Sequence, residues 1–207
     1  MEAEVKVEFW YDLASPESYL SAQRITDLSG KLSIALDWQP FLVEPIVRGG
    51  HVPEAMPTEA AYRRRDIERQ CAAQGLVLVW PSARPRSELL ATRVALVGAR
   101  HAWGPAFARH AFRARFAEGR DLESESVLQD ILKNLGLEAD LILAQAKASA
   151  SIRMLEAQIE RALDRGILEA PTFAVGDEVF WGNDRLDHAI AWACCEAPER
   201  RAGRLVP

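Results

Sequence analysis

FWYDLASPESYLSA, residues 9–22, joins the end of an apolar strand to the beginning of a helix. Apolar residues at alternate positions of Val5–Tyr11 predict the strand. Ser15 followed by Pro16 predicts the helix start, because serine is a favoured N-cap and proline suits the first helical position. A hydroxyl therefore lies at the positive end of a helix, where free backbone N–H groups and the helix dipole favour an anion such as a thiolate.

The residues on either side of this junction predict a strand-helix-strand unit. Apolar positions at helical spacing indicate a helix over Pro16–Leu28 that stops at Gly30. Alternation resumes over Ile34–Trp38 and ends at Pro40. We expect a right-handed crossover and parallel pairing for such a unit.

The middle of the chain is predicted to be helical. It begins with a long proline- and glycine-rich loop over Phe41–Pro57, a length typical of functional or mobile loops. Helical patterns then follow one another, apart from a loop around Trp80–Arg86. The expected helices are Thr58–Ala73, Ser87–Trp103, Pro105–Glu118, Ser124–Leu135, Ala139–Ser149 and Ser151–Asp164.

The last segment returns to strands. Pro171–Trp181 predicts a hairpin, because two apolar runs flank the turn Gly176-Asp177, and a final helix is expected over Arg185–Cys195. The two ends together predict an α/β, thioredoxin-like fold with an inserted all-helical domain. The expected parts are 1–44 and 166–207 for the thioredoxin-like domain and 45–165 for the helical insertion.

The composition is that of a globular protein: 49% of the 207 residues are hydrophobic and 27% are charged. The net charge of −5 argues against nucleic-acid binding. The opening MEAEVKVEF lacks the basic and apolar regions of a secretory signal, and no apolar run approaches membrane-spanning length. We therefore expect a cytoplasmic protein with no membrane or nucleic-acid partner.

The cysteines do not form a redox motif. Cys71, Cys194 and Cys195 are odd in number and lack the C-x-x-C spacing. The pair Cys194-Cys195 lies in the apolar run AIAWACC, which predicts buried thiols on a helix rather than a redox couple. The four histidines show no ligand spacing with cysteines or carboxylates, so no metal site is expected.

Two motifs near the C-terminus accompany Ser15, which taken alone is most simply a structural N-cap. Pro171 at a strand start is either an edge residue or a cis-proline, and in thioredoxin-like proteins the cis-proline faces the first helix N-terminus. Ala170 before it then offers backbone N–H and C=O to an extended peptide-like ligand. Asn183 and Asp184 are helix N-caps that could also bind the carboxylate and ammonium groups of an amino acid.

SPESYLSA, APTFAVGDEVFWGNDRL and the helical insertion resemble the 2-hydroxychromene-2-carboxylate isomerases. The same features are similar, more distantly, to the kappa-class glutathione transferases, and both groups are DsbA-like members of the thioredoxin superfamily. The resemblance extends from about Val5 to Trp192, which is nearly the whole chain.

The resemblance implies that glutathione supplies the sulfur and that Ser15 stabilises its thiolate. Ala170, before Pro171, would pair with the peptide part of glutathione, and Asn183 and Asp184 would contact its γ-glutamyl end. The implied reaction interconverts 2-hydroxychromene-2-carboxylate and trans-o-hydroxybenzylidenepyruvate by reversible thiolate addition in aromatic-compound catabolism. The implied partners are glutathione, a small aromatic carboxylate and a second copy in a homodimer.

The chain departs from the family pattern at several positions. Glu59 stands where a lysine is common, Glu169 stands where a glycine is common, and Arg86 with Ser87 replaces an Asn-Ser pair. His51 lies in a loop that often carries an asparagine. These departures concern recognition of the substrate rather than of the thiolate.

Aromatic and basic residues supply further candidates. Trp10 and Trp38 lie in predicted strands and are expected in the core. The run Arg63-Arg64-Arg65 predicts a solvated helix face with ion pairs, and an anion-binding role would belong to Arg65 or Arg69 if either faces inward. The candidates for an aromatic-substrate pocket are Trp80, Trp181, His51 and Arg86.

Two other functions stay open. One is a kappa-class-like glutathione transferase that acts on another electrophile, and the other is a thioredoxin-fold binding module without turnover. A disulfide oxidoreductase is disfavoured, because neither Ser15 nor Ser18 can exchange disulfides.

Overall fold

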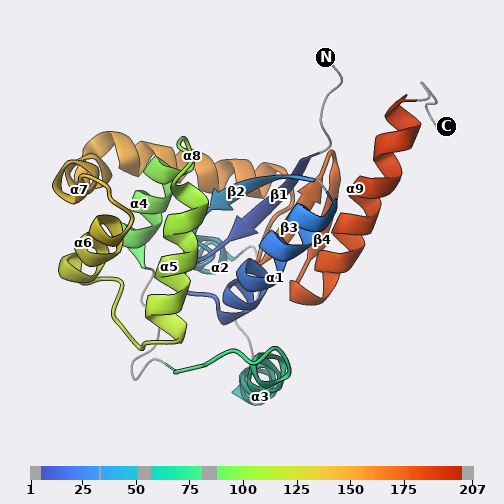
Figure 1. The fold of residues 1–207 in the computed structure, drawn as a ribbon, viewed down its shortest axis with the longest axis horizontal. Helices are drawn as coiled ribbons and strands as arrows, with labels where there is room; N and C mark the ends of the chain where they lie inside the picture. The colour runs from blue at the N-terminus through green and yellow to red at the C-terminus, as the bar shows by residue number, and fades with distance from the viewer. Residues whose placement is uncertain (1–5, 33, 51–56, 81–87, 202–207) are drawn as a thin grey trace.

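The computed structural model describes residues 6–32, 34–50, 57–80 and 88–201. Its four-stranded sheet has the order β2-β1-β3-β4 (Figure 1). β1 and β2 are parallel, and β3 is antiparallel to both β1 and β4, which confirms the predicted strand-helix-strand unit and hairpin. The strands are β1 (Lys6–Tyr11), β2 (Ala35–Pro40), β3 (Thr172–Val175) and β4 (Glu178–Trp181).

Most of the helices follow β2 and precede β3 in the sequence, as predicted for a helical insertion. In Figure 1, α4 to α7 gather at one end of the sheet and α9 lies at the other, beside β3 and β4. None of the helices in the described residues is long and apolar enough to span a bilayer. The helices are α1 (Pro16–Leu32), α2 (Glu44–Arg48), α3 (Pro57–Ala73), α4 (Leu89–Gly98), α5 (Gly104–Phe116), α6 (Glu125–Asn134), α7 (Ala139–Lys147), α8 (Ser149–Asp164) and α9 (Leu186–Arg201).

Side chains of β1 alternate between the two faces of the sheet and build a core on each. On one face, Phe9 stacks on Phe173 of β3 with 5.5 Å between ring centroids, and Trp38 packs edge-on against Phe9. On the other face, Trp10 packs against Phe41. Both tryptophans are buried, as predicted. The strand that leads to Ser15 is therefore fixed from both sides.

Several helix boundaries differ from the prediction. α1 continues through Gly30 to Leu32, because a glycine inside a helix weakens it without ending it. α2 forms within the segment predicted to be a long loop, of which residues 51–56 lie outside the described ranges. α4 ends at Gly98, and the following turn folds the Trp103 ring into the space that a Cβ on Gly98 would occupy.

The C-terminal helix also differs from the prediction. A short 3-10 turn over Asn183–Arg185 precedes α9, which continues past Cys195. The buried positions of α9 follow helical spacing, so Cys194 and Cys195 lie on its solvent side. The prediction that these two thiols are buried is wrong, although both are free, and Cys71 is the buried cysteine. The buried residues of α9 are Leu186, Ala189, Ile190 and Ala193.

A buried ion pair joins the beginning of α4 to the end of α5. The Nε of Arg115 lies 2.8 Å from Oε1 of Glu88, whose side chain is 1% exposed. Glu88 precedes α4 with a left-handed φ of 42°. Burial raises the pKa of Glu88 to about 7, and the charge of Arg115 opposes this rise. The Glu88 carboxyl of this buried pair therefore gains or loses its proton near neutral pH.

Candidate active site

Ser15 lies between the C-terminal end of β1 and the first turn of α1. Its Oγ accepts a hydrogen bond from the backbone N–H of Ser18 at 3.0 Å, which is N-cap geometry. The N–H of Ser15 donates to the C=O of Asp12 at 3.0 Å and closes a tight turn. The hydroxyl is therefore held at the end of a helix where free N–H groups favour negative charge.

The segment before β3 meets this hydroxyl. The Oγ of Ser15 donates to the C=O of Ala170 at 3.1 Å. The Ala170–Pro171 peptide bond is cis. The C=O of Pro171 accepts a hydrogen bond from the N–H of Gly182 at 2.9 Å. The fold thus brings together three motifs that are distant in the sequence: the Ser-Pro helix start, the cis-proline and the turn before α9.

Asp12 is a buried carboxylate beside Ser15 that sequence reasoning did not select. One of its oxygens accepts from the N–H of Ala14 at 2.8 Å, and the other accepts from the N–H of Val43 at 2.9 Å. These bonds tie the β1–α1 turn to the segment after β2. Burial raises the pKa of Asp12 to about 6, although the two N–H hydrogen bonds lower it.

The raised pKa of Asp12 gives a testable pH dependence. Folded Asp12 binds its proton more tightly than the unfolded chain, so its contribution to stability falls as the pH rises from about 4 to about 6 and is constant above that. We expect the free energy of unfolding of the wild type, minus that of Asp12→Asn, to fall by up to about 3 kcal/mol over this window. Urea denaturation between pH 4 and pH 8 measures it. Glu88 titrates in both proteins, so most of its contribution cancels in the difference, and the charge of Asp12 is the last of the causes that raise the pKa of Glu88. A difference that is independent of pH would contradict the raised pKa.

Asn183 is buried, and its side chain holds the fold together. Its Oδ1 accepts from the hydroxyl of Ser21 at 2.8 Å, and its Nδ2 donates to Oε1 of Gln70 at 2.8 Å. Its backbone C=O accepts from Arg24 at 3.2 Å. Asn183 therefore links α1, α3 and the beginning of α9, and half of the hydrogen-bonding capacity of its amide is used by Ser21 and Gln70.

Removing this amide should lower stability. We expect Asn183→Ala to reduce the free energy of unfolding by about 2–3 kcal/mol, because Ser21 and Gln70 lose buried partners. The matched control is Asp184→Ala at the exposed neighbouring position, which should change stability by less than about 0.5 kcal/mol. Chemical denaturation of both variants measures the difference. Equal stability of the two variants would show that the Asn183 amide is not a structural link.

Charged side chains from three segments surround Glu17 in the first turn of α1. Arg63 of α3 donates to Glu169, next to the cis-proline segment, at 3.2 Å. Burial raises the pKa of Glu17, the charge of Arg63 lowers it, and the charges of Glu169 and Asp184 raise it. Asp184 is exposed. This side of the site is thus acidic, with one arginine placed between carboxylates.

The helix face around Arg64 carries the predicted ion pairs. Arg64 and Arg65 both lie within 4 Å of Glu68, and Arg69 pairs with Asp66. Arg65 and Arg69 are exposed, so neither is the inward-facing arginine considered from the sequence.

Arg63 is the arginine that reaches the site, and the sequence did not single it out. Helical spacing places it on the same face of α3 as the buried residues Ile67 and Cys71, four and eight positions later. This spacing is the signal that could have identified it. Its partners Glu59 and Glu169 are two of the departures from the family pattern.

Two of the candidates for an aromatic-substrate pocket, Trp181 and Trp80, lie within the described residues. Trp181 ends β4 directly before Gly182 and is 55% exposed. The Nε1 of Trp80 donates to Glu68 at 3.0 Å, and the guanidinium of Arg64 lies 4.4 Å from the centre of its ring. His51 and Arg86 lie outside the described residues. A substrate pocket built from these residues stays a prediction.

The described part of the chain contains two cavities that lie away from Ser15. One of about 760 Å³ lies between β2, α4 and α8, and one of about 500 Å³ lies between α1, α5 and the residues after α3. Among the described residues, no group of three or more histidines, cysteines and carboxylates could hold a metal. The candidate site is therefore defined by the hydrogen bonds around Ser15.

Comparison with known sequences gives matches over most of the chain. A family model described as a DSBA-like thioredoxin domain matches residues 6–189. A 2-hydroxychromene-2-carboxylate isomerase from Sphingobium xenophagum is 27% identical over 186 residues, which are 87% of this chain and 94% of that protein. A protein of the same name from Pseudomonas putida is 27% identical over 184 residues, which are 87% of this chain and 90% of that one.

Comparison with solved structures gives the same architecture. The structure of a 2-hydroxychromene-2-carboxylate isomerase superposes with a TM-score of 0.84 and 23% identity, over 96% of this chain and 98% of that one. A probable DsbA oxidoreductase from Streptomyces coelicolor superposes with a TM-score of 0.75 and 17% identity, over 98% of this chain and 92% of that one. The predicted thioredoxin-like fold with a helical insertion is therefore confirmed.

Proposed function

This chain belongs to the family of DSBA-like thioredoxin domains, and we propose that it is a glutathione-dependent isomerase of 2-hydroxychromene-2-carboxylate or a close analogue. Two relatives with that name match it over nearly their whole length, which supports the substrate class. The observation that carries the proposal is the Ser15 hydroxyl at the start of α1, 3.1 Å from the carbonyl that precedes the cis-proline.

The groups around Ser15 fit the thiol and the peptide of glutathione. A hydroxyl and a helix N-terminus both favour a sulfur anion. One charge-assisted hydrogen bond contributes about 1.5–3 kcal/mol, which lowers a thiol pKa by about one to two units. A thiol with a pKa near 8.5 would then have a pKa of about 6.5 to 7.5, so roughly a quarter to three quarters of it would be ionised at pH 7. When bound, glutathione supplies a thiolate that adds reversibly to the C=C bond of the unsaturated acid and so permits rotation about it.

The hydrogen bond between Ser15 and Ala170 is exchanged for contacts with glutathione when glutathione binds. The hydroxyl has a single proton, which it donates to the C=O of Ala170. Stabilising the thiolate requires this proton to turn toward the sulfur. Ala170 then has a free carbonyl that can accept a peptide N–H in its place. The Ser18 N–H holds the oxygen in position throughout, so one rotation about the C–O bond prepares both contacts.

The charged neighbours bind the ends of the ligands. Asp184 is exposed and receives the γ-glutamyl ammonium, while Asn183 holds the turn that positions it. The guanidinium of Arg63 is already directed at the cis-proline segment, where it donates to Glu169. On binding, Arg63 releases Glu169 and pairs with a carboxylate of glutathione or of the substrate.

The test is incubation of the purified chain with 2-hydroxychromene-2-carboxylate, with and without glutathione, followed by absorbance. We expect conversion to trans-o-hydroxybenzylidenepyruvate only when glutathione is present, with no net consumption of glutathione. A stable conjugate with a generic electrophile, without isomerisation, would replace the proposal by the transferase alternative. No conversion at any protein concentration would leave a binding module.

A further inference from the structure

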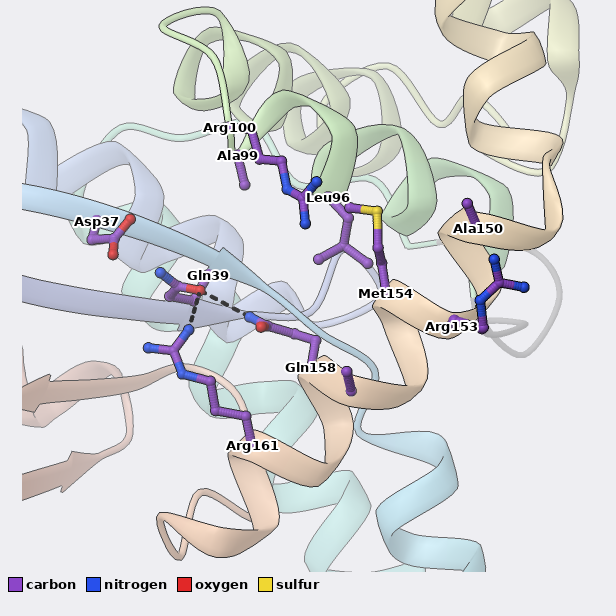
Figure 2. Close-up of a pocket in the computed structure, with 11 residues that line it drawn as sticks. Asp37, Gln39, Leu96, Ala99, Arg100, Ala150, Arg153, Met154, Gln158 and Arg161 are labelled. Carbon is purple, nitrogen blue, oxygen red and sulfur yellow. Dashed lines mark hydrogen bonds between the residues drawn. The ribbon is translucent and has the colours of Figure 1, made fainter.

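A cavity of about 760 Å³ lies at the edge of the sheet, away from Ser15. It is formed by the edge strand β2, the end of α4 and one face of α8, and Figure 2 shows these elements around it. None of the residues that form the Ser15 site lines it. Its volume lies within the range of pockets that bind small organic molecules.

The charges on the wall of this cavity are predominantly positive. Arg100 at the end of α4 and Arg153 on α8 are exposed and have no carboxylate partner among the described residues. The carboxylate that lines the cavity, Asp37, is paired with Lys6. This positive surface contrasts with the net charge of −5 of the chain.

A third arginine is fixed in place at the base of the cavity. The guanidinium of Arg161 pairs with Glu8 at 3.2 Å, donates to Oε1 of Gln39 at 3.1 Å and lies 4.9 Å from the centre of the Trp10 ring, so its charge is already partnered. Gln158 donates to the same oxygen of Gln39 at 2.9 Å (Figure 2). The carbonyl oxygen of Gln39 therefore accepts from two donors, which fixes the side chains of Arg161 and Gln158.

The rest of the lining is apolar. Leu96 is buried beneath the surface, and Met154 of α8 is partly exposed beside it. Figure 2 shows the side chain of Arg100 extending from α4 toward these two residues. A methionine thioether and a leucine form a suitable floor for a flat ring, since sulfur contacts with aromatic rings are favourable.

We infer that this cavity binds an organic anion with a flat apolar body, such as an aromatic carboxylate. The carboxylate pairs with Arg100, and the ring lies on Leu96 and Met154, toward which the Arg100 side chain extends (Figure 2). A role for Arg100 in stabilising the C-terminal end of α4 would explain that residue alone. It would not explain the apolar floor of Leu96 and Met154 beneath its side chain or the second unpaired arginine, Arg153, on the wall of the cavity. The inference is independent of the chemistry proposed at Ser15.

The probe is 2-naphthoate, and the readout is the methyl signal of Met154 in protein labelled with ¹³C at its methionine methyl groups. The chain has three methionines, so the spectrum is simple, and Met154→Leu assigns the signal. We expect a saturable shift of the Met154 signal. The double variant Arg100→Gln with Arg153→Gln should raise the dissociation constant at least tenfold, as should replacing the probe by uncharged 2-naphthylmethanol.

The control variants separate this cavity from other binding. Arg48→Gln, at an exposed arginine outside the cavity, should leave the dissociation constant unchanged. Ser15→Ala should leave it unchanged as well, which keeps this test distinct from that of the proposed function. No shift of the Met154 signal at millimolar probe, or equal affinity in the double variant, would overturn the inference.

Discussion

Replacing Ser15 with alanine is expected to lower kcat/KM for the glutathione-dependent isomerisation about 100- to 1000-fold. Loss of one donor that stabilises a developing or bound anion has an effect of this size. The hydroxyl is held by the Ser18 N–H and directed at the cis-proline segment, so no neighbouring hydroxyl of α1 replaces it. Steady-state kinetics at saturating glutathione measure the effect.

Stability must be followed in parallel, because Ser15 also caps α1. Loss of the cap is expected to lower the free energy of unfolding by about 1 kcal/mol, which leaves most of the protein folded at assay temperature. Ser15→Thr keeps both a hydroxyl and an N-cap, and should retain far more activity than Ser15→Ala. Activity of Ser15→Ala within about threefold of the wild type would remove Ser15 from the mechanism.

Replacing Arg115 with methionine is expected to lower the free energy of unfolding by about 3–5 kcal/mol, because it leaves the buried carboxylate of Glu88 without its charged partner. For a chain of this length, the expected fall in melting temperature is on the order of 10 °C. The loss should be smaller at pH 5 than at pH 8, since the pKa of Glu88 is about 7 and the carboxyl is neutral at the lower pH. Thermal unfolding at both pH values measures it.

A double variant tests the physical reason for this loss. Glu88→Met combined with Arg115→Met removes both charges and should recover most of the stability that Arg115→Met loses. If the single and double variants are equally unstable at pH 8, the lost stability comes from packing of the Arg115 side chain rather than from an unpaired charge.

The parts of the fold that the sequence predicted depend on local signals. The alternation in β1, the Ser15-Pro16 helix start and the hairpin before α9 are determined by residues within a few positions of one another. The pairing of the Ser15 hydroxyl with the cis-proline segment followed from recognising both motifs, although a long stretch of chain separates them. These elements could therefore be predicted from the sequence alone.

The parts that were not predicted depend on contacts between distant segments. The hydrogen bonds of the Asn183 amide with Ser21 and Gln70 were not predicted, because they come from helices that the sequence could not orient. Arg63 reaches Glu169 across 106 positions of sequence. Helical spacing places Arg63 on the inner face of α3, but only the packing of α3 against α1 brings it to Glu169.

The most direct test of the central claim is a pH titration of the ultraviolet thiolate absorbance of glutathione bound to the protein at saturation. The account predicts an apparent thiol pKa at least about one unit below that of free glutathione, and a return toward the free value in Ser15→Ala. An apparent pKa equal to that of free glutathione in the wild type, or the same value in both proteins, would contradict it.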